Sequence, residues 1–456
     1  MRKKTLLVLL MAAVLLLSGC ELIKKDQAVD DATPILTLGD QVINKKQFLA
    51  EQEYQMAYMA SYYRMFGQAL DYTNPAVMEA VRNAAADTLK QNLAIEAKAA
   101  ELGLNVLTEE EEARAQENAK STYESACEEF KSEFFADTTL EGDALEEAVA
   151  AKMDETISEA LGKATASMDY YVDGARKNLI NDKVREYIIR DVAVTDEEIQ
   201  ADFDSKVAAD QEKYAENAGS YATAANNGTT TLYWTPAGVR RVKQILIKFK
   251  DEDSKAISDA QAKVKSANGS IEAAQLVVDD EAADAEAKEA AKTSLETAKA
   301  ELEAAQAELD AAKKAAFANI DADADAVVEA LANGEDWAKL AEEKNEDPGM
   351  KAGAPTAETG YAVAAGMTSF DAAFVDAAMA LEKVGDVSGK VASDTYGYYI
   401  IRYESDVQEG AVALDTVKDS IHDTLLSSRQ NETYQATVDE WVKAAGIKED
   451  LGALNN

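Results

Sequence analysis

Basic residues are scarce in this sequence of 456 residues. It has 46 lysines and arginines against 85 aspartates and glutamates, which gives a formal net charge of -39 and a pI near 4.4. A protein of this charge repels the phosphate backbone of nucleic acids and anionic lipid headgroups. We therefore expect no nucleic acid among its partners.

Long apolar runs are also scarce, and the clearest one lies at the amino terminus. Basic residues at positions 2–4 precede the apolar run Leu6–Leu17, which is short for a membrane-spanning helix and has the layout of a secretion signal. The residues Leu-Ser-Gly-Cys at positions 17–20 resemble a bacterial lipobox. This resemblance implies a lipoprotein signal peptide over residues 1–19, lipid on the sulfur of Cys20, and a tether that ends at residue 34.

Cysteine and histidine are almost absent. With Cys20 in the anchor, Cys127 is the remaining thiol, so no disulfide can form within the mature chain. The single histidine, His422, is far in sequence from any candidate site, and we interpret it as a surface or interhelix residue. Packing alone must stabilise the fold, for which a hydrophobic content of 47% is sufficient.

A mostly helical domain is predicted over residues 35–235. Alternating apolar residues in Pro34–Phe48 predict a β-hairpin, and a helix should start near Asn44. The following residues, 47–66, are rich in tyrosine and methionine on all sides of the helix. Two interpretations stay open: an ordinary core helix, or a surface that contacts client proteins through adaptable side chains.

The rest of this domain is predicted to be acidic and helical. Asn74-Pro75 opens a second helix, and a long acidic helical region covers residues 109–190. We interpret its acidic runs, 109–112 and 141–147, as solvated faces. Residues 217–228, rich in Asn, Gly and Ala, are predicted to form a loop or linker.

The stretch from Asp336 to Tyr403 predicts a small α+β unit. Apolar residues recur at helical spacing from Trp337 and again over Phe370–Leu381, before the period changes to that of a strand at Tyr398–Tyr403. The β-branched run Val239–Phe249 is the predicted partner strand.

The order of these elements resembles the parvulin-type peptidyl-prolyl isomerases. Separated motifs carry the resemblance: KQILI at 243–247, Gly334–Ala341 with Trp337 in its aromatic position, Asn345–Gly349, FVDAAMAL at 374–381, VGDVSGKV at 384–391 and YGYYIIRY at 396–403. The amino-terminal hairpin and the segment at 96–115 are similar to PrsA-like and SurA-like extracytoplasmic foldases.

The resemblance implies a proline-binding cup beside a cluster of polar residues. The implied catalytic residues are Asp347, at the family's Asp/Cys position, and Gln244 and Tyr399, at the two positions where these isomerases carry histidine. Both histidines are therefore missing, although Gln and Tyr can still donate and accept hydrogen bonds. The implied substrate-binding residues are Phe374, Met379, and Met367 or Phe370 at the pocket methionine position, which the spacing leaves open.

No metal or cofactor is expected, because rotation about an X-Pro bond breaks no covalent bond. Its barrier of about 18–20 kcal/mol comes from the amide resonance that rotation removes. A catalyst has only to favour the twisted amide over both planar forms.

Residues 252–319 predict an antiparallel coiled-coil insertion. Apolar residues repeat every seven positions, with Ala three positions after most of them, at Ile257, Val264, Ile271, Val278, Leu295, Leu302 and Leu309. Pairing Val264 with Leu309 centres the turn near Glu286. The alternative is a turn at Asn268-Gly269, and the simplest interpretation of the segment is an insertion without activity.

The predicted fold class is thus α+β: a helical chaperone domain, an inserted parvulin-like domain over residues 236–406 that carries the helical hairpin, and carboxy-terminal helices over residues 407–456. These last helices, at Leu414–Leu425 and Tyr434–Val442, should pack on the amino-terminal domain.

Three functions follow as hypotheses. The first is a prolyl isomerase foldase at the extracytoplasmic face of the bacterial cell membrane, acting on X-Pro segments of unfolded or newly exported proteins. The second is a non-catalytic holdase chaperone. The third, a solute-binding lipoprotein, is disfavoured because alternating α/β lobes are not visible. The oligomeric state, including a homodimer, stays open.

Overall fold

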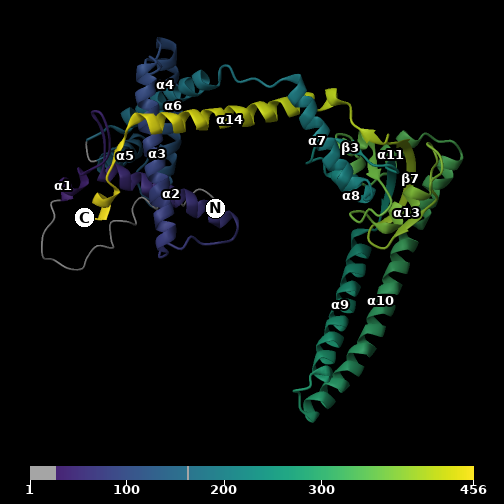
Figure 1. Cartoon of the computed structure of the whole chain (residues 1–456). Coiled ribbons are helices and arrows are strands. Elements are labelled where there is room, and N and C mark those ends of the chain that lie inside the picture. The colour runs from purple at the N-terminus through teal and green to yellow at the C-terminus, as the bar shows by residue number, and fades with distance from the viewer. Residues whose placement is uncertain (1–26, 162–163, 456) are drawn as a thin grey trace. The chain divides into compact units, whose positions relative to one another are not determined.

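The computed structural model describes residues 27–161 and 164–455 (Figure 1). It divides into two compact units: a helical unit, up to Val194 together with Asp423–Asn456, and a sheet unit, Thr195–His422. The structure is mostly helical with small antiparallel sheets, as predicted. The predicted signal peptide and Cys20 lie outside the described residues.

The helical unit begins with the predicted hairpin, β1 (Pro34–Leu38) and β2 (Gln41–Asn44). Asn44 then caps α2 (Lys45–Met65), because its side chain accepts a hydrogen bond from the backbone of Gln47. The short helix α1 (Gln27–Asp31) lies in the predicted tether. Its Asp30 pairs with the buried Lys45 at 3.2 Å, which docks this part of the tether onto α2.

Helix α2 is not a core helix. Phe48 and Ala60 are its buried apolar residues, whereas Tyr58 is 66% exposed and Met65 is 80% exposed. The interpretation as an ordinary core helix is therefore wrong. The apolar part of α2 that faces solvent needs another explanation.

The predicted acidic helical region forms three helices after α3 (Pro75–Glu101), namely α4 (Glu109–Phe134), α5 (Asp143–Leu161) and α6 (Ser167–Ile189). Asn74 caps α3, and Thr108 forms a capping box with Glu111 at the start of α4.

The carboxy-terminal segment returns to the helical unit. It forms one helix, α14 (Lys418–Ala445), where two were predicted, because the intervening residues 426–433 contain no Gly or Pro that would end a helix. Val438 of α14 packs with Ile95 and Val184. Strand β9 (Lys448–Glu449) then adds to β1, and η5 (Leu451–Asn455) follows.

The sheet unit is built on two long antiparallel strands, β4 (Arg240–Lys248) and β7 (Gly397–Asp406), both predicted from the sequence. The sheet order is β5-β4-β7-β6, with short edge strands β5 (Tyr361–Val363) and β6 (Val391–Ser393). Side chains alternate between its two faces. One face packs against α13 (Ala372–Ala380), and the other against α11 (Trp337–Lys344) and α10.

The sheet unit begins before the predicted boundary at residue 235. Helices α7 (Asp196–Tyr214) and α8 (Ala218–Asn227) pack into its core through Tyr214 and Tyr221. The predicted loop or linker at 217–228 is wrong, because Asn217 caps α8 and Gly228 ends it in a left-handed conformation. Strands β3 (Trp234–Thr235) and β8 (Gly410–Ala411) pair beside it.

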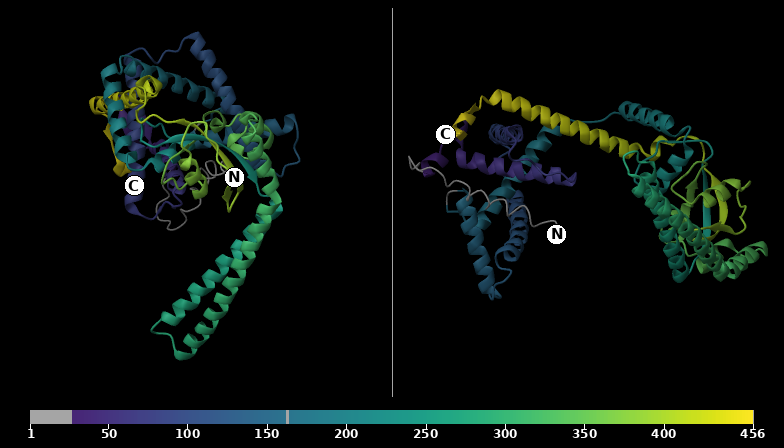
Figure 2. Two further views of the ribbon diagram at one scale, coloured as in Figure 1. Left: turned by 90° about the vertical axis from the view of Figure 1, so that its right-hand side faces the viewer. Right: turned by 90° about the horizontal axis from the view of Figure 1, so that it is seen from below.

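The predicted coiled-coil hairpin is formed by α9 (Asp251–Asp279) and α10 (Ala285–Ala332), which lie side by side in Figures 1 and 2. Ion pairing of Lys263 with Glu308 fits the predicted register. Helix α9 continues through Gly269, so the alternative turn there is wrong. Helix α10 runs past the predicted end at residue 319 into the core of the sheet unit.

The remaining elements of the sheet unit are short: η3 (Pro348–Met350), α12 (Pro355–Thr359) and η4 (Leu414–Thr416). Within residues 27–161 and 164–455, none of the helices combines the length and the apolar character needed to cross a membrane.

Candidate functional site

A cavity of about 420 Å³ opens on the α13 face of the sheet. Its walls come from β4, β7, β5, η3 and the start of α13. Its lining includes Gln244, Asp347, Tyr361, Phe370, Phe374 and Tyr399. Because side chains alternate along β4 and β7, Gln244 and Tyr399 lie on this same face.

The segment after α11 docks onto the free side of β4 and thereby carries Asp347 to the cavity. The side-chain amide of Asn345 accepts a hydrogen bond from Leu246 N and donates one to the carbonyl oxygen of Gln244, both within 2.9 Å. The backbone N–H of Glu346 donates to the Leu246 carbonyl at 3.0 Å. These contacts imitate a neighbouring strand, which fixes Asp347 above Gln244.

Asp347 is the centre of a buried hydrogen-bond network. Its Oδ2 accepts hydrogen bonds from Gln244 Nε2 at 2.7 Å and from the Tyr361 hydroxyl at 3.0 Å. Its Oδ1 accepts one from Gly349 N at 2.9 Å. Asp347 and Gln244 are each 7% exposed. A buried carboxylate held by three donors is stable without a cationic partner.

Tyr361 was not predicted from the sequence. It opens β5, a strand of three residues that was too short to recognise as a strand. Burial raises the pKa of its hydroxyl, and the charge of Asp347 and the hydrogen bond to it raise the pKa further. Tyr361 therefore stays protonated and donates to Asp347 at neutral pH.

Four aromatic rings form the apolar wall of the cavity. Consecutive rings in the series Tyr361, Phe370, Phe374 and Tyr399 meet edge to face, with centroids 5.1, 5.6 and 5.2 Å apart. Such contacts favour a rigid wall. Within this wall Phe374 is buried, whereas Phe370 is half-buried.

Tyr399 is part of this wall as well as of the core. It is buried, and burial is the main cause that raises the pKa of its hydroxyl, while a hydrogen bond with Ser393 acts in the opposite direction. The hydroxyl of Ser393 in turn donates to Asp371. Tyr399 therefore presents a ring packed on Phe374 rather than a freely exposed polar group.

The structure brings five of the sequence-predicted residues to one cavity and leaves two outside its lining. Gln244, Asp347, Tyr399, Phe370 and Phe374 line it. Met367 is buried in the core close to α8, and Met379 packs on the same core. Between the two candidates for the pocket methionine position, Phe370 is the one that lines the cavity.

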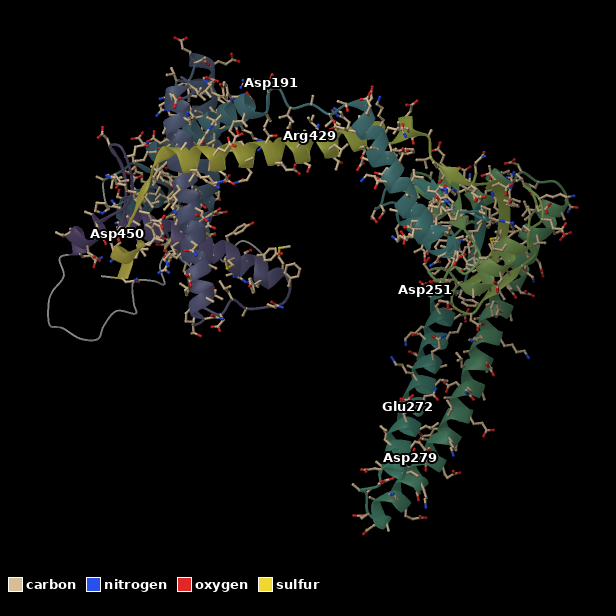
Figure 3. The ribbon with its side chains drawn as sticks, in the orientation of Figure 1. Asp191, Asp251, Glu272, Asp279, Arg429 and Asp450 are labelled. Carbon is tan, nitrogen blue, oxygen red and sulfur yellow. The ribbon has the colours of Figure 1, made fainter. Side chains whose placement is uncertain are left out.

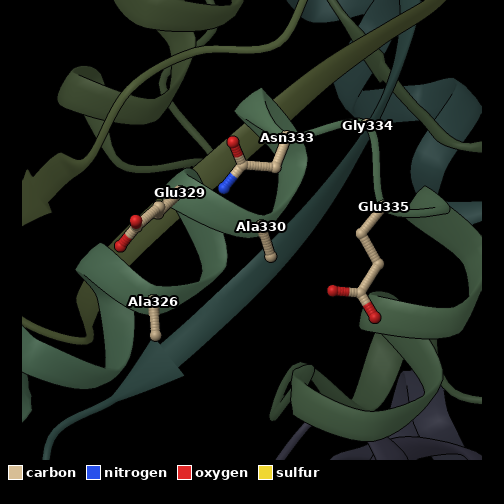
Figure 4. Close-up of a pocket in the computed structure, with 6 residues that line it drawn as sticks. All are labelled: Ala326, Glu329, Ala330, Asn333, Gly334 and Glu335. Carbon is tan, nitrogen blue, oxygen red and sulfur yellow. The ribbon is translucent and has the colours of Figure 1, made fainter.

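Another hollow, of about 520 Å³, lies at the end of α10 (Figure 4). Figure 4 shows Glu329, Asn333 and Glu335 around it, together with small residues. It offers no aromatic wall for an apolar ring. No group of His, Cys, Asp and Glu side chains within the part of the chain that the structure describes could hold a metal ion.

No family model matches the chain. It is 36% identical over 115 residues to the foldase protein PrsA of Clostridium botulinum strain Hall, which is 25% of this chain and 32% of that protein. It is 34% identical over 126 residues to the PrsA foldase of Clostridium kluyveri, 27% of this chain and 35% of the relative. The chain is similar to PrsA.

The similarity to PrsA confirms the predicted resemblance to that group of foldases, and it spans about a third of the curated relatives' length. Two solved structures are also similar. The chain is 15% identical to a SurA-like chaperone of Campylobacter jejuni (72% and 95% of the two chains, TM-score 0.26) and 13% identical to PrsA of Streptococcus pneumoniae (93% and 98%, TM-score 0.22).

Proposed function

We propose that this protein is an extracytoplasmic folding factor, and that the cavity of its sheet unit isomerises X-Pro bonds in exported proteins. One observation carries the proposal: an aromatic cavity of about 420 Å³ whose polar side is a hydrogen-bond network around the buried Asp347. The similarity to PrsA foldases supports the folding role.

The aromatic wall fits a proline ring. The ring would pack on Phe374 and Phe370, and this contact excludes water from the prolyl amide. Resonance makes the planar amide more polar than the twisted one. An apolar seat therefore disfavours the planar forms and lowers the barrier.

The network around Asp347 holds the wall in place and needs no proton transfer. Asp347 fixes Tyr361 and Gln244 through hydrogen bonds, and Tyr361 supports the ring of Phe370. The absence of both histidines should reduce the rate of isomerisation without abolishing it, because the aromatic wall that would bind the proline ring is present.

Exchange spectroscopy tests this function directly. The peptide acetyl-Ala-Leu-Pro-Phe-amide exchanges its prolyl isomers over about tens to hundreds of seconds when uncatalysed. Substoichiometric protein should accelerate the exchange, and Phe370→Ala should remove most of the acceleration. Unchanged exchange with the wild-type protein, together with the absence of chemical-shift changes in the peptide, would reject the isomerase function.

A second function, holding unfolded chains, is favoured by the exposed face of α2. Its large exposed residues are Leu49, Tyr54, Tyr58, Tyr62, Tyr63 and Met65, followed by Phe66. Exposed apolar patches on soluble proteins mark interaction sites. The variant Tyr58→Ser/Tyr62→Ser/Met65→Ser should lose suppression of aggregation of an unfolded test protein and keep peptide isomerisation. Equal suppression by the variant would reject α2 as the holding surface.

The lipobox supports anchoring at the membrane through Cys20. Labelled fatty acid should enter the wild-type precursor and not Cys20→Ala, with Cys127→Ala as the matched control. Equal labelling of Cys20→Ala and the wild type would reject the anchor.

A further inference from the structure

The α9–α10 hairpin is mounted rigidly on the sheet unit. Helix α10 continues without a break from the hairpin into the core, where Ile320, Ala324 and Val327 are buried. Lys390 binds both Asp321 and Asp325 at 2.6 Å and so clamps α10 to the segment that precedes β6. An insertion that was merely tolerated would not need to share its helix with the core.

The hairpin carries its large exposed apolar side chains at one place. Leu276 is 73% exposed and Val277 is 39% exposed, in the last turn of α9. The seam of the hairpin is closed by small buried residues such as Ala267, Ala274 and Ala298. Leu276 and Val277 do not pack in the seam, because they lie on the outside of the helix pair.

The same end of the hairpin is strongly acidic. Residues 272–289, which we call the hairpin tip, hold seven acidic residues and one basic one: Glu272, Asp279, Asp280, Glu281, Asp284, Glu286 and Glu289 against Lys288. Figure 3 shows Glu272 and Asp279 at this end. Asp280 and Asp284 accept hydrogen bonds from nearby backbone N–H groups. Glu272, Glu281 and Glu286 form no ion pair with the described residues, so their charges face solvent.

We propose that the hairpin tip binds cationic, apolar segments of unfolded client chains. The apolar pair supplies the contact, and the surrounding carboxylates select Lys and Arg by charge complementarity. Two side chains cover far less area than the roughly 1,200 Å² that a stable complex of folded proteins buries. A short segment of an unfolded chain therefore fits this surface better than a folded partner. The inference rests on the proposed function only in naming an unfolded client chain as the partner.

The length of the hairpin turns the tip into a second binding point. The 29 residues of α9 span about 43 Å at 1.5 Å per residue. An unfolded chain needs about 12 extended residues to cover this distance. A client held at the tip would have a raised effective concentration at the cavity, provided that its X-Pro bond lies at least that far along the chain.

Direct binding tests the tip without any catalysis. The probes are two fluorescent peptides of about 20 residues, in which pairs of Leu and Val alternate with Lys in one peptide and with Glu in the other; opposite charges attract at low salt. We expect the Lys peptide to bind the full-length protein, with an affinity that falls as salt is added, and the Glu peptide to bind at least about fivefold more weakly.

Two variants separate the apolar contact from the charge. Leu276→Ser/Val277→Ser should weaken the Lys peptide about fivefold or more, because it removes the apolar contact. Glu272→Gln/Glu281→Gln/Glu286→Gln should weaken it about three- to tenfold at low salt. The matched control, Glu301→Gln/Glu303→Gln/Asp310→Asn, removes equal charge from the shaft of α10 and should keep the affinity. Wild-type affinity in both tip variants, or equal loss in the control, would overturn the proposal.

A linker series tests the second binding point. A shortened Lys peptide of about six residues, Leu-Val-Lys-Leu-Val-Lys, is joined to Ala-Leu-Pro-Phe by a flexible linker of about 4 or about 24 residues, so that only the peptide with the longer linker can span the hairpin. The tip should accelerate isomerisation of the long-linker peptide alone, and Leu276→Ser/Val277→Ser should remove that gain while the free tetrapeptide exchanges as before. A gain of equal size with both linkers would contradict the geometry. Absent exchange of the free tetrapeptide would reject the isomerase function and leave the binding result intact.

Discussion

Gln244 Nε2 donates a hydrogen bond of 2.7 Å to Oδ2 of Asp347, although the two residues are 103 positions apart in the sequence. In the sequence, Gln244 lies in β4, before the α9–α10 hairpin, and Asp347 lies directly before η3, after the hairpin. The parvulin resemblance implies a histidine at position 244, and here a neutral amide satisfies the buried carboxylate instead.

Replacing Gln244 should show what this contact contributes. Gln244→Leu leaves Asp347 with one donor fewer, and we expect the free energy of unfolding to fall by about 1.5–3 kcal/mol, the range for hydrogen bonds to charged groups. Gln244→Glu places two carboxylates together, which raises the pKa of the pair. Its stability should be retained at acid pH and lost as the pH rises through that raised pKa. Thermal unfolding of both variants across pH measures this, and a pH-independent deficit in Gln244→Glu would contradict it.

The two phenylalanines of the cavity should differ in what they support. Phe374 is buried in the core, so Phe374→Ala should lower the free energy of unfolding by about 3–5 kcal/mol. Phe370 is half-buried, so Phe370→Ala should lower the free energy of unfolding clearly less than Phe374→Ala does. We expect the two variants to reduce isomerisation equally strongly. Denaturant unfolding measured beside peptide exchange separates the two effects. Equal stability losses would mean that Phe370 is a core residue and not a contact for the substrate.

Isomerisation should be nearly independent of pH between about 6 and 9, because no histidine lines the cavity. Burial raises the pKa of both Tyr361 and Tyr399. Their contribution to stability is therefore fully present below the unfolded phenol value of about 10 and is lost as the pH rises through the folded values. Exchange rates and unfolding temperatures across pH test this. A bell-shaped rate profile centred near neutral pH would contradict it.

Two helical glycines should respond in opposite ways to alanine. At Gly269, in the shaft of α9, an added Cβ meets nothing within 4 Å, so Gly269→Ala should stabilise the protein by about 0.5–1 kcal/mol. At Gly219 in α8 an added Cβ would clash with the backbone nitrogen of Met367, so Gly219→Ala should destabilise the protein by about 1–3 kcal/mol. Thermal unfolding of the pair measures both. A neutral Gly219→Ala would mean that α8 can move away from the core.

The sequence by itself determined the regular elements whose signals are local. The coiled-coil seam, the two long strands and the helix starts at Asn44 and Asn74 all follow from residues within a few turns of one another. The resemblance to parvulins also assigned Gln244, Asp347 and Tyr399 to one site from sequence motifs alone.

Only the tertiary structure decided which of these residues share a cavity, and with what. Tyr361 lines the cavity because its strand of three residues, β5, pairs with β4. Met367 lies outside the lining because the backbone of Gly366 and Met367 packs against α8. The sequence also did not decide the exposure of α2 or the packing of α8 in the sheet unit. Periodicity shows that a residue is apolar on one face, but burial depends on which distant segment covers that face.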